Sequence, residues 1–310
     1  MMRYIFFGSS EFSCIILERL CQQSISPSLI ITQPPKKKGR GLKELPTEVG
    51  LFAKENNLTL LTPENLNNGE LIEKIRKFEP HLFIVVDYGK KIPKNLLLIP
   101  KILPLGIHPS ILPKYRGPAP INWAIINGEK YSGVTIFKIT EKIDSGQIIL
   151  QKAIEILDTD DAISLKNKLA FLAVDLLLET LNNIKTNNFK LTPQDQNLAT
   201  FAPKLKKEDG KINWDNEAKC IFNLIRGLKG WPSAYTYFHQ TMIKVLEAEV
   251  CEQKVLQPPA TIVKIDKTGI YVSTKKGILK IKKLQPQNKK NMDAYAFVIG
   301  HKVKVGDKFL

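Results

Sequence analysis

Apolar runs and helical stripes alternate along the first 190 or so residues. Wholly apolar runs such as Leu82–Val86 suit strands of a parallel sheet that is covered on both faces. The alternation therefore predicts a doubly wound, Rossmann-like α/β domain over residues 1–190. Its strands are predicted near residues 3–7, 29–32, 82–86, 133–139 and 147–153, and its helices near residues 12–20, 65–78 and 162–184.

The pattern changes after residue 190. Residues 191–205 lose their period and gain Thr, Pro, Gln and Asn, which is the composition of a linker. A helix is predicted at residues 216–228, and short β segments follow it. Such segments indicate a small β-barrel of the oligonucleotide-binding (OB-like) type over residues 206–310. Its strands are predicted at residues 234–238, 242–250, 260–265, 270–273, 277–284 and 302–309.

Composition limits the class of protein. Hydrophobic residues make up 43% of the chain and charged residues 25%, which is the balance of a globular protein. The longest apolar runs are shorter than the roughly 20 residues that cross a bilayer, and the N-terminus shows no secretion signal. The four cysteines are scattered and form no CxxC pair, which favours neither a zinc site nor a disulfide framework. We therefore expect a cytoplasmic protein without a membrane partner, and a monomer.

The net charge of +16 is the first indication of a partner. A surface this basic attracts polyanions, so nucleic acid becomes a candidate, with compositional drift as the alternative. Residues 204–310 hold 21 Lys and Arg against 10 Asp and Glu, a net charge of +11. Residues 1–203 carry a net charge of only +5. The positive charge is concentrated in the predicted barrel.

Two loops of the predicted α/β domain are candidates for anion binding. Residues 36–43 hold five cations in eight positions, which suits phosphate contacts, although a solvated charge run is the usual explanation. The turn Gly8-Ser9-Ser10 precedes a helix and could hold an anion at its N-terminus. It lacks the glycine patterns of nucleotide-binding loops, so capping of the helix explains it equally well. We assign no nucleotide site there.

One histidine and one aspartate are the candidates for catalysis. His108 leaves the end of an apolar strand, and Asp144 lies in a turn before the next strand. Ligands bind at the strand ends of open α/β sheets, so the two side chains can meet in a cleft. A carboxylate beside an imidazole orients the ring and suits it to relay a proton or to stabilise a developing oxyanion. Taken alone, such a pair is more often structural.

The motifs around His108 and Asp144 favour the catalytic interpretation over the structural one. The loop reads Ser110-Ile111-Leu112-Pro113-Lys114-Tyr115-Arg116-Gly117, and the turn reads Asp144-Ser145-Gly146. With this spacing, the chain closely resembles the folate-dependent formyltransferase family. The resemblance continues beyond the catalytic domain, which points to the branch of the family that acts on tRNA. It includes residues 7–12, 32–34, 39–41, 88–89, 203–205, 212–214, 231–234 and 284–286.

The resemblance implies an activity and its site residues. It implies transfer of a formyl group from 10-formyltetrahydrofolate to the α-amine of methionine esterified to initiator tRNA, for translation initiation, with no metal. His108 and Asp144 would be catalytic. The folate slot would be formed by Ser110, Ile111, Leu112 and Pro113, with Tyr88 and Gly89 at the neighbouring strand end; for Tyr88 a packing role is the alternative. The tRNA contacts would be Lys38, Arg40, Lys43, Lys282, Lys283, Lys289 and Lys290.

One position departs from the family pattern. Gly106 stands where the family has an Asn that hydrogen-bonds the transferred group. Removing one such donor typically lowers kcat about 100- to 1000-fold, so restoring it by Gly106→Asn is expected to raise turnover at least tenfold. Two other functions stay open: a formyltransferase for another amine, such as an amino sugar nucleotide, and a catalytically impaired tRNA-binding relative. Transfer of labelled formyl to methionyl-tRNA distinguishes them.

Overall fold

The chain forms two compact units. A computed structural model describes residues 2–38, 43–251, 253 and 256–310. The first unit comprises Met1–Pro120, Tyr131–Glu155 and Lys166–Pro203, and the second comprises Ile121–Lys130, Ile156–Leu165 and Lys204–Leu310. Two short segments of the first 190 residues thus belong to the second unit. The domain and linker boundaries inferred from the sequence stay predictions.

The first unit is built on a seven-stranded sheet with the order β5-β2-β1-β6-β7-β8-β9. The strands β5, β2, β1, β6 and β7 pair in parallel, and β8 and β9 extend the sheet in antiparallel fashion. The chain moves outward from β1 to β2 and β5, then returns to place β6 on the other side of β1, which is the doubly wound arrangement. The strands are β1 (Tyr4–Gly8), β2 (Leu29–Ile31), β5 (Leu60–Leu61), β6 (Leu82–Val86), β7 (Leu103–His108), β8 (Tyr131–Lys138) and β9 (Ile148–Glu155).

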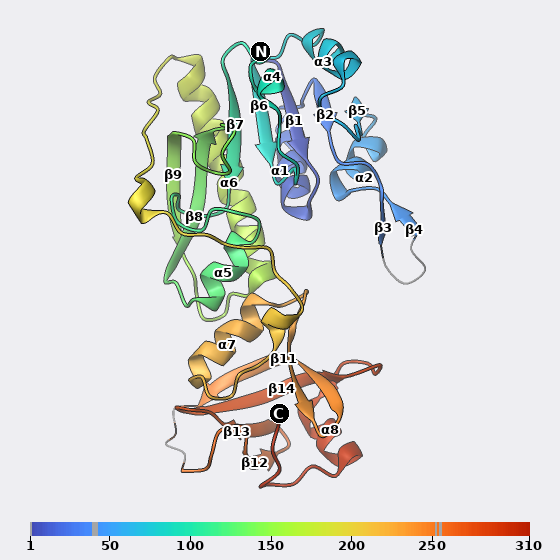
Figure 1. The fold of residues 1–310 in the computed structure, drawn as a ribbon, viewed down its shortest axis with the longest axis vertical. Coiled ribbons are helices and arrows are strands. Elements are labelled where there is room, and N and C mark those ends of the chain that lie inside the picture. Colours follow the sequence, from blue (N-terminus) through green and yellow to red (C-terminus); the bar gives the residue numbers. More distant parts are fainter. Residues whose placement is uncertain (1, 39–42, 252, 254–255) are drawn as a thin grey trace. The chain divides into compact units, whose positions relative to one another are not determined.

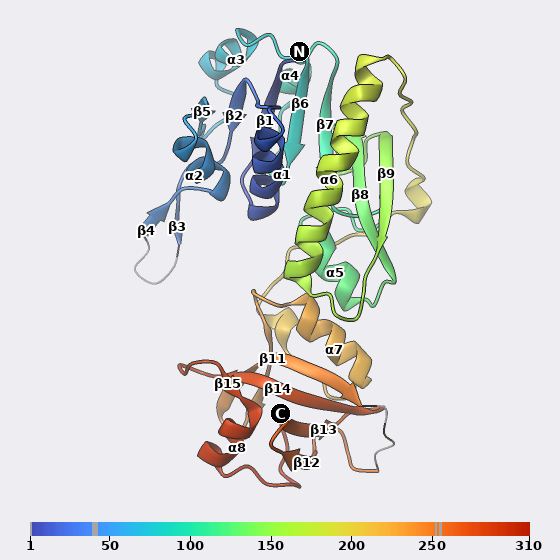
Figure 2. The ribbon, with the colours of Figure 1, turned by 180° about the vertical axis from the view of Figure 1, so that it is seen from behind.

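Helices cover both faces of this sheet. Figure 2 shows α1 (Glu11–Gln22) and α6 (Ala162–Lys185) lying over one face. On the opposite face, alternate strand residues pack against α3 (Gly69–Arg76) and α4 (Lys94–Leu97), because successive side chains of a strand point to opposite sides. The remaining elements of the first unit are the hairpin β3 (Lys36–Lys38) and β4 (Lys43–Leu45) and the helix α2 (Glu48–Glu55), whereas α5 (Pro120–Ile126) belongs to the second unit from Ile121 on. No helix of the described part of the chain is long and apolar enough to span a bilayer.

The second unit contains an antiparallel sheet with the order β10-β11-β14-β13-β12 (Figure 1). The C-terminal segment joins its two edges, since Phe309 bridges Phe238 and Lys308 bridges Thr261. This closure is consistent with the predicted small barrel. The short helix η1 (Gln196–Leu198) still belongs to the first unit. The elements of the second unit after it are η2 (Glu208–Gly210), α7 (Ala218–Gly227), β10 (Ala234–Phe238), β11 (Thr241–Cys251), β12 (Ile262–Asp266), β13 (Gly269–Ser273), β14 (Ile278–Pro286), β15 (Met292–Asp293) and α8 (Ala294–His301).

The predicted strand at residues 302–309 is wrong. The chain forms α8 just before this segment, and Lys302 then takes left-handed backbone angles, with φ at 52°. Gly306, with φ at 97°, turns the chain again. Two left-handed residues cannot lie in one extended strand, so only residues 308 and 309 make β bridges. The helix escaped sequence analysis because its apolar residues lie on several faces and show no helical stripe.

Phe309 is expected to stabilise the second unit strongly. Its ring is 2% exposed, stacks on Trp214 with centroids 5.7 Å apart, and also contacts Phe238. Phe309→Ala is expected to lower the free energy of unfolding by about 3–5 kcal/mol. Urea unfolding followed by tryptophan fluorescence measures this, because Trp123, Trp214 and Trp231 all belong to the second unit. Leu310→Ala, at an exposed side chain, is the matched control, and equal losses in the two variants would contradict the prediction.

Candidate active site

His108 is the last residue of β7 and is almost fully buried. It pairs with Thr135 of β8 and is 6% exposed. Its Nε2 atom lies 2.8 Å from the carbonyl oxygen of Tyr115. Because a carbonyl oxygen only accepts hydrogen bonds, this contact implies that Nε2 carries a proton. The other ring nitrogen, Nδ1, is therefore the atom left for chemistry.

The structure brings Asp144 to that nitrogen. Asp144 lies in the turn between β8 and β9, and its Oδ2 atom is 3.6 Å from Nδ1 of His108. The same oxygen accepts a hydrogen bond of 2.9 Å from the backbone N–H of Gly117. A separation of 3.6 Å is too long for a hydrogen bond, but catalytic hydrogen bonds commonly shorten when substrate binds. Two motifs that are 27 residues apart thus meet in one place.

Residues 110–117 form a loop that is held by an internal hydrogen bond and by side chains of β8 and β9. The Ser110 hydroxyl donates to the carbonyl of Lys114 at 2.7 Å. Thr135 of β8 donates to the carbonyl of Ser110 at 2.7 Å and accepts from the N–H of Leu112 at 3.1 Å. Gln151 adds a third tie, to the carbonyl of Leu112. Sequence reasoning missed Thr135 and Gln151, because a polar residue within a strand carries no signal of the loop it faces.

The residues predicted to form the folate slot differ in their exposure. Ser110 and Leu112 are each 2% exposed, whereas Ile111 and Pro113 are half-buried. Tyr88 is 2% exposed and packs its ring edge-on against Phe7. This placement matches the packing alternative, and burial raises the pKa of Tyr88 to about 12. Contact of these residues with folate stays a prediction.

The segment around Gly89 is tied to two polar residues. The backbone carbonyl of Tyr88 accepts hydrogen bonds from Nε2 of Gln33 at 2.5 Å and from the hydroxyl of Ser9 at 3.2 Å. Gly89 has φ at 77°, and a side chain there would meet Gln33. In the turn that precedes α1, Ser10 caps the helix in a capping box with Ser13. The serines of that turn therefore have structural partners.

Gly106 lies beneath an aromatic ring. It pairs with Phe137 of β8, so the two residues face the same side of the sheet. A Cβ atom at position 106 would lie 2.5 Å from Cε1 and Cζ of Phe137 and 3.1 Å from Cγ1 of Ile139. The Phe137 ring, 4% exposed, thus fills the space that a side chain at position 106 would need. The single substitution Gly106→Asn is accordingly no longer expected to raise turnover.

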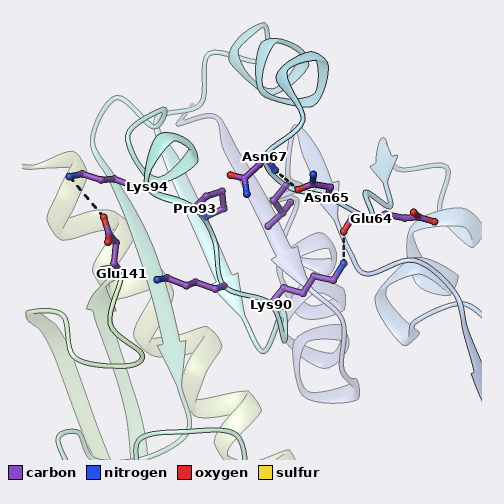
Figure 3. A pocket seen from close by; sticks show the side chains of 9 residues that line it. Glu64, Asn65, Asn67, Lys90, Pro93, Lys94 and Glu141 are labelled. Atoms are coloured by element: carbon purple, nitrogen blue, oxygen red, sulfur yellow. Dashed lines mark hydrogen bonds and ion pairs between the residues drawn. The ribbon is translucent and has the colours of Figure 1, made fainter.

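A cavity of about 470 Å³ lies in the first unit (Figure 3). It is bordered by the segment that follows Gly89 and by the turn that carries Asp144. Lys90 donates to the carbonyl of Glu64 at 2.8 Å, and Lys94 lies 4.0 Å from Glu141. Its volume is within the range of small-molecule sites, and three lysines make it suitable for an anionic ligand. The lining residues are Glu64, Asn65, Leu66, Asn67, Lys90, Lys91, Pro93, Lys94 and Glu141.

The cations predicted to contact tRNA fall in both units. In the first, Lys38 pairs with Lys43 in the β3–β4 hairpin, and Lys43 is exposed. Arg40 lies outside the described residues. In the second, Lys289 and Lys290 are exposed in the turn between β14 and β15.

Two of the predicted lysines are paired with carboxylates. Lys282 donates to Glu249 of β11 at 2.7 Å, and this hydrogen bond lowers the pKa of Glu249. Lys283 donates to Glu247 at 3.0 Å, which raises the pKa of Lys283. An exposed ion pair is weak, so phosphate can still replace the carboxylate. The contacts of these lysines with tRNA stay predictions.

The fold and the site define an α/β enzyme whose histidine and aspartate meet at the carboxyl edge of a doubly wound sheet. Residues 2–181 match the family described as "Formyl transferase", and residues 204–302 match "Formyl transferase, C-terminal domain". The chain belongs to the formyl transferase family.

Individual relatives extend this similarity along the whole chain. The chain is 42% identical over 302 residues to a methionyl-tRNA formyltransferase of Thermodesulfovibrio yellowstonii, which covers 97% of each chain. Among solved structures, HypX from Aquifex aeolicus in complex with tetrahydrofolic acid matches 99% of this chain and 48% of its own, with a TM-score of 0.67 and 19% identity. WlaRD, a sugar 3N-formyl transferase, matches 94% of this chain and 99% of its own, with a TM-score of 0.66 and 20% identity. These two structures show the shared fold.

Proposed function

We propose that this protein transfers a formyl group from 10-formyltetrahydrofolate to the α-amine of methionine carried by initiator tRNA. The observation that carries the proposal is the 42% identity, over 97% of both chains, to a methionyl-tRNA formyltransferase. The identity includes the basic second unit, which a tRNA substrate explains. This role belongs to translation initiation in the cytoplasm, and we propose that the protein acts as a monomer.

The cavity in the first unit is the proposed site for part of the folate. Folate ends in a glutamate with two carboxylates, and Lys90, Lys91 and Lys94 give the cavity a positive border. Lys91 is the best candidate to bind these carboxylates, because Lys90 already donates to the carbonyl of Glu64 and Lys94 lies 4.0 Å from the carboxylate of Glu141. When bound, the folate supplies the formyl group to a site that we place beside His108 and Asp144. We expect residues 110–113 to border that site.

His108 and Asp144 can supply the proton transfers that acyl transfer to an amine requires. The amine forms a bond to the formyl carbon and loses a proton, while the formyl oxygen gains charge. The bond from the formyl carbon to N10 of the folate then breaks, and N10 takes up a proton. The Oδ1 atom of Asp144 has no hydrogen-bond partner among the described residues, and the side chain is 20% exposed, so this oxygen can accept the proton. Tyr115 fixes Nε2 of His108, which leaves Nδ1 to exchange a proton with Asp144 or to donate to the charged oxygen.

A transfer assay tests the proposal. Purified protein is supplied with 10-formyltetrahydrofolate labelled in the formyl group, and with methionyl-tRNA, free methionine or an amino sugar nucleotide as the acceptor. We expect label in methionyl-tRNA and none in the other two acceptors. Transfer to the amino sugar would establish the second candidate function. Binding of tRNA without any transfer would indicate a catalytically impaired relative.

Lys289 and Lys290 are expected to contribute to tRNA binding. Neither has a carboxylate partner among the described residues, so both charges are available to phosphates. The double variant Lys289→Ala/Lys290→Ala is expected to weaken tRNA binding and to reduce the slope of log K against log salt by about 1.5 to 2. Binding of labelled tRNA at several salt concentrations measures both quantities.

The control is Lys275→Ala/Lys276→Ala, an adjacent exposed pair in the turn between β13 and β14, in which Lys276 lies 3.6 Å from Glu217. It removes the same charge from the same unit. If both double variants change the slope equally, tRNA is attracted by overall charge and the predicted contact is wrong.

Arg40→Ala in the basic loop is expected to impair use of tRNA and to leave folate binding unchanged.

A further inference from the structure

A buried glutamine connects the two motifs of the candidate active site. Gln194 is 7% exposed and follows α6, in the stretch whose composition predicts a linker. That stretch is paired within the first unit, since Thr192 bridges Ile148 and Phe201 bridges Arg116. Gln194 therefore has a fixed position in the same unit as His108 and Asp144.

The amide group of Gln194 uses all of its hydrogen-bonding capacity. Its Nε2 atom donates to the backbone carbonyls of Asp144 at 2.9 Å and of Gly146 at 2.7 Å. Its Oε1 atom accepts from Nε and Nη2 of Arg116 at 3.1 and 2.6 Å. A side-chain amide has two donors and one acceptor oxygen with two lone pairs, so no capacity remains for other partners.

These bonds close a ring around the catalytic carboxylate. Arg116 is 5% exposed, and the next residue, Gly117, donates its N–H to Oδ2 of Asp144. Gln194 thus holds the backbone of the turn that contains Asp144. It also holds Arg116, and the neighbour of Arg116, Gly117, donates its N–H to the Asp144 side chain. This one network therefore fixes both the backbone and the carboxylate of Asp144.

The backbone of Asp144 requires such support. Its φ of 48° lies in the left-handed region, which non-glycine residues populate sparsely unless surrounding contacts impose it. The carbonyl of Asp144 and that of Gly146, two residues on, are both fixed by Gln194. Without these bonds the turn can relax, and the carboxylate can leave its position 3.6 Å from Nδ1 of His108.

We propose that Gln194 is a positioning residue for formyl transfer, which holds the Asp144 carboxylate against His108 from the segment after α6. This inference rests on the proposed function. It assigns to residues 191–203 a part in the active site in place of a connecting role. A displacement of about 1 Å of a reacting group can lower turnover by about 100-fold, so the loss of Gln194 should affect kcat.

The test compares Gln194→Glu with Gln196→Glu. A glutamate at position 194 can still accept from Arg116, but it cannot donate to the carbonyls of Asp144 and Gly146. Gln196 is the control, because it also accepts from Arg116, at 2.9 Å, while its Nε2 donates, among the described residues, to the carbonyl of Gln194 alone. Its side chain is exposed, whereas that of Gln194 is buried. Both variants add the same charge beside the same guanidinium.

We expect Gln194→Glu to lower kcat by about 10- to 100-fold, with KM for folate and for tRNA changed less than about threefold. The control should stay within about threefold of the unchanged protein in all three constants. A merely structural role would lower the thermal stability and the active fraction of Gln194→Glu, whose side chain is buried, and would leave kcat per active molecule unchanged. If Gln194→Glu does not fold, Gln194→Asn, whose amide is one methylene too short to reach both sides, replaces it.

A second readout reports the position of Asp144 without activity. The N–H of Gly117 donates to Oδ2 of Asp144, so its hydrogen exchange should accelerate in Gln194→Glu and not in Gln196→Glu. If kcat or this exchange rate is the same in both variants, the inference is overturned. If the unchanged protein transfers no formyl group, the proposed function fails, and the exchange rate still decides whether Gln194 holds Asp144.

Discussion

Replacing His108 or Asp144 with alanine is expected to lower the kcat of formyl transfer by about 1000-fold or more and to leave the fold intact. Proton transfer by a positioned side chain typically accelerates a reaction by 10² to 10⁴, and the two groups lie 3.6 Å apart. Because they act as one unit, the double variant should be at most a few-fold slower than either single variant. Single-turnover transfer from labelled folate donor to methionyl-tRNA measures all three proteins.

A further variant separates the charge of Asp144 from its hydrogen bond. Asp144→Asn can still accept from the N–H of Gly117 but carries no negative charge, so it should be nearly as slow as Asp144→Ala while Gly117 keeps its protection from exchange. His239→Ala is the histidine control, since His239 is exposed in the turn between β10 and β11. Near-normal turnover in His108→Ala or Asp144→Ala would remove that residue from the mechanism.

The sequence predicted β1, β2 and β6 well because their apolar runs are unbroken. The sequence prediction of β6 at residues 82–86 agrees with the structure, and β7 ends at His108 as the motif requires. The meeting of His108 with Asp144 was also predicted, but not its geometry: β8 runs antiparallel to β7, so the turn after β8 must fold back to reach His108. Composition was the weaker guide, because it presented residues 191–203 as a connecting segment although they are paired within the first unit.

Contacts between distant segments could not be predicted in the same way. Gln194 reads as one polar residue in a polar stretch, and only the fold brings it to Arg116 and to the turn 50 residues earlier in the chain. The ring above Gly106 depends on the register of β7 against β8, which hydrophobic alternation does not specify to the residue. The sequence shows that position 106 lacks a side chain, but it does not show that Phe137 fills the space.

Phe137 decides what an asparagine at position 106 can do. Gly106→Asn alone must push aside a ring whose Cε1 and Cζ atoms lie 2.5 Å from the new Cβ, in a part of the core where Phe137 is 4% exposed. Overpacking of this kind typically costs about 1–3 kcal/mol. We therefore expect the single variant to be less stable than the unchanged protein and no faster.

Shortening the Phe137 side chain should allow an asparagine at position 106 to raise turnover. A leucine at position 137 lacks Cε and Cζ atoms, so Gly106→Asn/Phe137→Leu has room for the amide. A hydrogen-bond donor aimed at developing charge contributes about 100- to 1000-fold when well placed. We expect the double variant to have a kcat at least about tenfold above that of Phe137→Leu, with KM for folate within about threefold, because the new bond strengthens as charge appears.

The control for this comparison is Gly106→Ala/Phe137→Leu, which adds the Cβ atom but no amide. Steady-state kinetics with methionyl-tRNA, together with thermal unfolding of each protein, separate a gain in turnover from a gain in stability. A double variant with asparagine that is no faster than the one with alanine would show that the amide is not the missing element. Charge on the transferred group would then have to be stabilised by other groups, such as His108 once its Nδ1 atom is protonated.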